Sequence, residues 1–194
     1  PLYVQLTRGR SVEFAAFSIT FLSVGWTSGS FIFSRVLSHW KESAVILLGA
    51  ALSVPSLAAA GLLVAREGSL AWILGTFVLV GLGVGLVSTA SQTLMQASSD
   101  ESEMGRVNAA HQFVRNLSIT LAVALGGAVI LSVVDAQVGD VEIVRGVLAG
   151  EDLTVGPETM DAVGQGLAWA HVPSVVMALG CLGVAISLIR RERD

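Results

Sequence analysis

The sequence predicts an all-α membrane protein, a polytopic bundle of transmembrane helices. Its 194 residues are 53% hydrophobic and only 13% charged, whereas soluble domains carry about 25% charged residues. Apolar stretches recur that are long enough to cross a bilayer, which takes about 20 residues in one helix. Short polar segments separate these stretches, and short connections join antiparallel neighbours. The surroundings of this chain are therefore expected to be mostly lipid.

Five stretches qualify as transmembrane helices, and only one of them carries a charge near its middle. We expect the spans at residues 12–34, 43–65, 69–97, 106–134 and 162–189. Residues 2–6 are too short to span and are typical of the tail of a helix. The chain begins with Pro1, and no charged leader precedes an apolar core, so we expect a fragment of a longer protein and no signal peptide.

Three of these spans contain residues that shape a helix locally. Glu13 falls in the first turn of the first span, where the helix dipole favours an acid. Pro55 and Pro173 are expected to kink the second and fifth spans, because proline cannot donate a backbone hydrogen bond.

Small residues recur at positions where helices could touch. Helices in lipid cannot rely on the hydrophobic effect to associate, so close packing at glycine matters more. We expect packing at glycines spaced four apart or adjacent: Gly25 and Gly29, Gly81 and Gly85, and Gly126 and Gly127. The alternative is that some of them mark helices that slide or bend.

Polar side chains run along one face of the third span and one face of the fourth. They follow the three- and four-residue spacing of helical neighbours: Ser88, Ser91, Gln92 and Gln96, then Asn108, His111, Gln112 and Arg115. Both faces lie in the halves of the two helices that adjoin one short loop. In lipid, two such faces should turn towards each other or towards a water-filled cavity.

Arg115 is the charge in the middle of the fourth span, about 13 Å along the helix from Arg106. One interpretation is structural: the side chain caps carbonyls, pairs with a neighbouring helix or reaches towards the interface. The other is that Arg115 lines a cavity, where it binds an anionic group or tunes a proton-carrying carboxylate. His111, one turn earlier, could titrate near neutral pH or serve only as a hydrogen-bonded packing residue.

Several kinds of function lack support in the sequence. The net charge of −4 and the absence of a basic cluster with aromatics argue against nucleic-acid binding. The three histidines fall in separate elements and Cys181 is the only cysteine, so we expect no metal site and no internal disulfide. No catalytic motif or cofactor motif is present, so we expect neither an enzyme nor a cofactor.

Counting Lys and Arg predicts the orientation, because cytoplasmic loops carry an excess of these residues. The following side has six and is placed in the cytoplasm: Arg35, Lys41, Arg106, Arg190, Arg191 and Arg193. The other side has Arg8, Arg10, Arg66 and Arg145. The C-terminus is then cytoplasmic, the acidic loop at about 135–161 lies outside, and the protein is expected in the plasma (inner) membrane.

The third and fourth spans also resemble a known family pattern. The run GLGVGLVSTASQTLMQ, a Met-Gly pair eight residues later and the segment NAAHQFVRNL are similar to the EmrB/QacA-type drug/proton antiporters. These carriers form the fourteen-helix branch of the major facilitator superfamily. The matching positions are Thr93, Leu94, Gln96, Met104, Gly105, Phe113, Arg115 and Leu117.

The resemblance implies the C-terminal six-helix half of such a carrier, with its first helix truncated. It implies secondary active, proton-coupled efflux of drugs or amphipathic compounds, with the missing N-terminal half, a small-molecule substrate, protons and membrane lipid as partners. One half alone is not expected to transport. The candidate cavity or gating residues are Arg115, Asn108, Gln112, His111, Gln92 and Gln96. The alternative is a polytopic membrane subunit with an assembly or sensor role and no transport.

Overall fold

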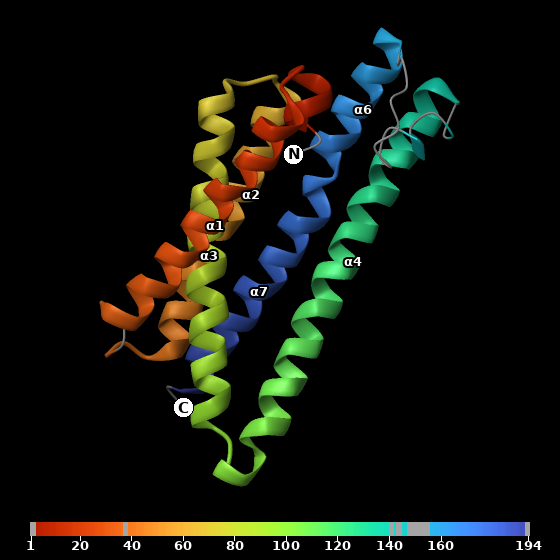
Figure 1. The fold of residues 1–194 in the computed structure, drawn as a ribbon. Coiled ribbons are helices and arrows are strands. Elements are labelled where there is room, and N and C mark those ends of the chain that lie inside the picture. The colour runs from red at the N-terminus through yellow and green to blue at the C-terminus, as the bar shows by residue number, and fades with distance from the viewer. Residues whose placement is uncertain (1–2, 37–38, 140–141, 143–144, 147–155, 193–194) are drawn as a thin grey trace.

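The computed structural model describes residues 3–36, 39–139, 142, 145–146 and 156–192, and in these ranges the chain is helical and forms no strand. Figure 1 shows the helices side by side in one elongated bundle. Five helical segments are long and apolar enough to cross a membrane. The predicted all-α transmembrane bundle is therefore confirmed.

The described helices follow the predicted spans closely. They are α1 (Val12–Arg35), α2 (Glu42–Ala65), α3 (Leu70–Ala97), α4 (Met104–Val138), α6 (Pro157–Trp169) and α7 (His171–Arg191). A short π-helical turn, η1 (Tyr3–Thr7), precedes them, and a 3-10 turn, η2 (Glu101–Glu103), joins α3 to α4. At the start of α1 the Ser11 hydroxyl accepts a hydrogen bond from the backbone N–H of Phe14 at 3.3 Å.

The fifth predicted span is divided into two helices at Ala170. Pro173, in the first turn of α7, has no N–H to donate to the carbonyl of Trp169, four residues earlier. Nearby, His171 Nδ1 donates to the backbone carbonyl of Leu167 at 2.9 Å, because a carbonyl can only accept. The break therefore comes where the backbone ladder loses a donor, three residues before the proline.

The tightest contact in the bundle joins α1 to α3. A Cβ added at Gly25 or Gly29 would lie less than 3.0 Å from a backbone oxygen of α3, and one added at Gly81 or Gly85 would lie equally close to α1. The structure thus places these four glycines at one backbone-to-backbone contact. Gly49 and Gly83 make a similar contact between α2 and α3, where the sequence pattern predicted none.

The other predicted packing glycines do not lie at such a contact. No atom of another helix in the described chain lies within 4 Å of a Cβ built at Gly126 or Gly127. Both are on α4, which packs against α6 at one end and approaches α3 near η2 at the other. Figure 1 shows α4 running apart from α1, α2 and α3 between these ends. The packing predicted for these two glycines is therefore not found within the described bundle.

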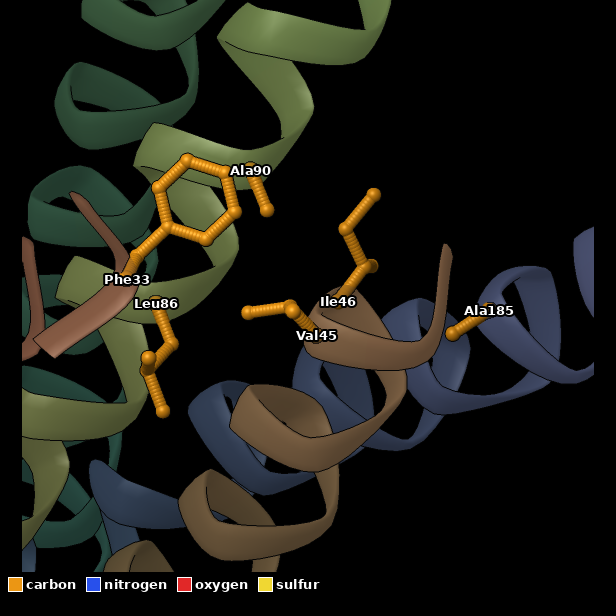
Figure 2. Close-up of a cluster of buried hydrophobic side chains, with 6 residues drawn as sticks. All are labelled: Phe33, Val45, Ile46, Leu86, Ala90 and Ala185. Carbon is orange, nitrogen blue, oxygen red and sulfur yellow. The ribbon is translucent and has the colours of Figure 1, made fainter. Parts of the chain in front are cut away.

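Buried apolar clusters hold the bundle at three places. Figure 2 shows one of them, in which Phe33 of α1, Leu86 of α3 and Ala185 of α7 gather around the first turns of α2. A second joins Tyr3 and Val4 of η1 to α1, α2 and α3. The third joins α4 to α6. Since η1 contributes two buried residues, the segment before α1 is part of the packed structure.

The predicted outer loop is shorter than expected. Residues 135–161 were expected to be loop, but α4 continues to Val138 and α6 begins at Pro157. Gly139 ends α4 with a φ of 71°, a left-handed conformation that glycine adopts without strain. Most of what connects the two helices lies outside the described residues.

Candidate functional site

A cavity of about 410 Å³ opens between the α1–α2–α3 group and the helices α4 and α7. This volume lies in the range of ligand pockets in proteins. Its lining is mostly apolar, with a few polar groups. The lining residues are Trp26, Ala50, Ser53, Leu57, Val84, Val87, Ser88, Ser91, His111, Arg115, Ser118, Ile119, Met177, Ala178 and Cys181.

Arg115 projects from α4 across this cavity to α1. Its guanidinium carbon lies 4.6 Å from the centroid of the Trp26 ring, a cation–π arrangement. Its Nη1 also donates to Gln112 Oε1, three residues earlier on the same helix, at 3.3 Å. The guanidinium therefore points across the cavity towards α1.

His111 lines the same cavity four residues before Arg115, on the same face of α4. Its Nδ1 is inaccessible to solvent and has no hydrogen-bond partner among the described residues. An unsatisfied buried polar atom costs about 1–3 kcal/mol. The sequence allowed two interpretations of this histidine, a titrating group or a hydrogen-bonded packing residue. Among the described residues Nδ1 makes no hydrogen bond, so the structure does not support the second interpretation through this atom.

The hydroxyl groups around the cavity differ from these two side chains. Ser53 Oγ donates to the Gly49 carbonyl at 2.8 Å, and Ser118 Oγ donates to the Val114 carbonyl at 2.8 Å. Each is thus bonded to its own helix. Arg115 keeps further N–H donors beside its bond to Gln112. Among the described residues, no hydrogen bond is formed by the other lining hydroxyls, those of Ser88 and Ser91, or by His111.

Other predicted polar residues lie outside this cavity, towards the α3–α4 turn. Gln96 Nε2 on α3 donates to Asn108 Oδ1 on α4 at 3.0 Å. Gln92 is half-buried on α3, and neither it nor Gln112 is among the residues that line the cavity. The polar faces of α3 and α4 therefore turn towards each other. Near the turn they form an interhelical hydrogen bond, and further in their residues line the cavity.

Sequence reasoning missed Trp26, Met177 and Cys181 as cavity residues. Trp26 carried one usable signal, since it falls in the middle of an apolar span whereas tryptophan in membrane proteins favours the interfaces. Met177 and Cys181 carry no such signal, because they belong to an apolar helix whose facing cannot be read from its sequence.

The charge balance of the cavity is one-sided. Among the described residues no carboxylate lines it, and no acid lies within 4.0 Å of Arg115 to form an ion pair. Within the same residues no three His, Cys, Asp or Glu side chains come together to hold a metal ion. The chemistry that the described cavity offers is binding by a guanidinium, an imidazole, an indole ring and an apolar wall.

A comparison with known proteins assigns most of the chain to one family. Residues 1–123 match the family model of the Major Facilitator Superfamily, a range that covers η1, α1, α2, α3 and more than half of α4. No curated protein and no solved structure matches the chain. The matched range covers most of the sequence and includes Trp26 and Arg115. The chain therefore belongs to the major facilitator superfamily of multi-pass membrane transporters.

Proposed function

We propose that this chain is part of a secondary active transporter that exports drugs or other amphipathic organic compounds in exchange for protons. The observation that carries the proposal is the cavity into which Arg115 projects, large enough for a drug-sized molecule and walled mainly by apolar side chains. The resemblance of the third and fourth spans to EmrB/QacA-type antiporters supports the same assignment.

The proposed substrate position is the cavity between Trp26 on α1 and Arg115 on α4. An apolar body would lie against Leu57, Val84 and Met177, while polar groups would meet Arg115 and His111. In such a site the apolar wall accepts ligands of different shapes, and a few polar contacts orient them. This division suits a carrier with several amphipathic substrates.

A second, N-terminal half of the same carrier is the proposed partner of this chain. Alternating access moves one helical bundle against another around a site at their interface. In the described part of the chain no acidic residue lines the cavity, so the carboxylate that relays protons is proposed to come from that other half and to lie away from Arg115. On this view the 194-residue chain binds ligand but does not transport by itself.

The orientation remains part of the proposal. One end of the bundle holds the C-terminal ends of α1, α3 and α7 together with the η2 turn (Figure 1). This is the end with more Lys and Arg. We therefore place this end and the C-terminus in the cytoplasm, in the inner membrane. A reporter that is active only in the cytoplasm, fused after Asp194, should be active.

Efflux by the full carrier tests the proposed function. Arg115→Ala should reduce efflux of an amphipathic dye by about tenfold or more, and Arg115→Lys should keep part of it, because lysine retains the charge without the planar fork. Arg106→Ala is the matched control, since this side chain pairs with Glu103 on the surface. Wild-type efflux in both Arg115 variants would remove Arg115 from the transport site and favour a membrane subunit without transport.

A further inference from the structure

The charge of the Arg115 side chain is only partly compensated. A guanidinium carries five N–H donors, and one hydrogen bond, to Gln112, accounts for one of them. The Trp26 ring attracts the cation from one side, but a neutral ring leaves the net charge in place. Among the described residues no acid balances it. A fixed positive charge inside a mostly apolar cavity calls for an anion.

The geometry of the site suits an acidic headgroup. A carboxylate, sulfonate or phosphate can accept two parallel N–H bonds from one guanidinium. The stacking on Trp26 holds the guanidinium in place, so less freedom is lost on binding. His111 also lines the cavity one helical turn away, but its Nδ1 is inaccessible to solvent, so the headgroup contact rests on Arg115.

A cationic ligand meets the opposite conditions. In a site walled by Leu57, Val84 and Met177 the local dielectric is low, so repulsion between a bound cation and Arg115 is poorly screened. The face of the Trp26 ring that Arg115 covers is also closed to a bound cation.

We propose that the cavity selects organic anions, with the acidic headgroup on Arg115 and the apolar body against the α2, α3 and α7 walls. This inference rests on the proposed function, for which it names the charge class of the substrate. The same chemistry could be met by a free amphipathic acid or by the headgroup of an anionic lipid.

Ligands that differ only in charge provide the test. The 194-residue chain is reconstituted in phosphatidylcholine nanodiscs with Trp40, Trp72 and Trp169 replaced by Phe, so that Trp26 is the one remaining indole. These three rings are 50%, 72% and 59% exposed, so their replacement leaves the buried clusters intact. Trp26 fluorescence is then followed while octanoate, octylammonium or octan-1-ol is added.

Octanoate should bind about tenfold more tightly than octylammonium, with octan-1-ol between them, as the strength of a charge-assisted pair implies. Arg115→Gln should weaken octanoate binding about tenfold and bring the three ligands together. Arg106→Gln removes the same charge from the surface and should change nothing. Equal binding of octylammonium and octanoate, or octanoate binding that is unaffected by Arg115→Gln, would overturn the inference.

Nanodiscs containing phosphatidylglycerol separate the two sources of anion. If a free acid is the ligand, octanoate still binds in these discs, with the same dependence on Arg115. If the lipid headgroup occupies the site, octanoate binding is lost and phosphatidylglycerol co-purifies with the wild-type chain but not with Arg115→Gln. Either result supports anion selection and assigns its source.

Transport in the full carrier keeps this inference distinct from the proposed function. Export of octylammonium in preference to octanoate would overturn anion selection while leaving the carrier intact. Binding of octanoate that depends on Arg115, without export of any of the three compounds, would leave anion selection standing and overturn the efflux function.

Discussion

The contact of α3 with α1 and its contact with α4 are built in opposite ways. Towards α1, glycines bring the two backbones together, so that no room is left for a ligand. Towards α4, Figure 1 shows the two helices meeting near η2 and separating further in. The cavity that Arg115 lines lies between them and α7. The difference teaches that small residues close a helix pair, whereas a long charged side chain between helices leaves space beside it.

This comparison also separates the rigid part of the chain from the part that offers chemistry. The backbone contact depends on the absence of side chains at Gly25 and Gly81, so it has one geometry. Among the described residues, one side-chain hydrogen bond crosses between α3 and α4. It joins Gln96 to Asn108. Substitutions should therefore have unequal effects on the two sides.

The largest effect is expected at the glycine contact. Gly25→Ala places a Cβ against the Val78 carbonyl and should lower the free energy of unfolding by about 3 kcal/mol, the upper range for an overpacked interior. Denaturant titration followed by circular dichroism measures it. Gly126→Ala is the control, because its Cβ meets open space and alanine favours helix by up to about 1 kcal/mol. Similar losses at both glycines would show that the contrast between the two sides is false.

The coupling between Arg115 and Trp26 should be the next largest. A double-mutant cycle with Arg115→Gln and Trp26→Leu should return about 1–2 kcal/mol of coupling in the free energy of unfolding, as expected for a half-buried cation–π pair. Arg35 and Phe31, 5.7 Å apart at an exposed end of α1, provide the matched pair and should couple by less than about 1 kcal/mol. Equal coupling in the two pairs would contradict the view that half-burial in the cavity strengthens the pair at Arg115.

A smaller effect is expected at the hydrogen bond between α3 and α4. A cycle with Gln96→Leu and Asn108→Leu should show a coupling of about 0.6 kcal/mol, the average for interhelical hydrogen bonds in membranes. The same denaturant titration measures it. A coupling above that of Arg115 with Trp26 would place the main α4 attachment near the turn and not at the cavity.

The smallest effect concerns pH at the C-terminal end of α7. The Ser43 hydroxyl and the Lys41 ammonium hold the pKa of Glu192 below its usual range, and Lys41 Nζ lies 3.3 Å from Glu192 Oε2. A carboxylate with a lowered pKa in the folded state contributes stability above its unfolded pKa, and this contribution is lost as pH falls through the folded value. Stability should therefore decline slightly as the pH drops below the ordinary glutamate range. In Glu192→Gln this part of the decline should be absent.

The family match and the structure bear out different parts of the sequence reasoning. The five spans and the facing of the third and fourth polar stripes could be predicted, since hydropathy and helical spacing are local properties. The site was only partly predictable. Arg115 and His111 line the cavity, but Gln92, Gln96, Asn108 and Gln112 do not, because a helical spacing specifies a face and not the depth at which a neighbouring helix departs.

The glycines illustrate the same limit. Gly25 and Gly126 look equivalent in sequence, as small residues in apolar helices. Of these two, Gly25 meets the backbone of another helix and Gly126 does not. The difference arises because the path of α4 past its neighbours depends on all the side chains between the helices. Trp26 is a further case: its mid-span position was visible, but its partner across 89 residues of sequence was not.

By itself the sequence determined that the chain forms helices long and apolar enough to cross a membrane, and that one of them carries a costly charge. These follow from hydrophobicity and backbone hydrogen bonding, which act residue by residue. The tertiary structure alone decided which helices touch and that the Arg115 guanidinium lies over the Trp26 ring. It also decided that Arg115 lines a cavity in which no described lining residue is acidic. Such features arise from packing between segments distant in sequence, and no local pattern encodes them.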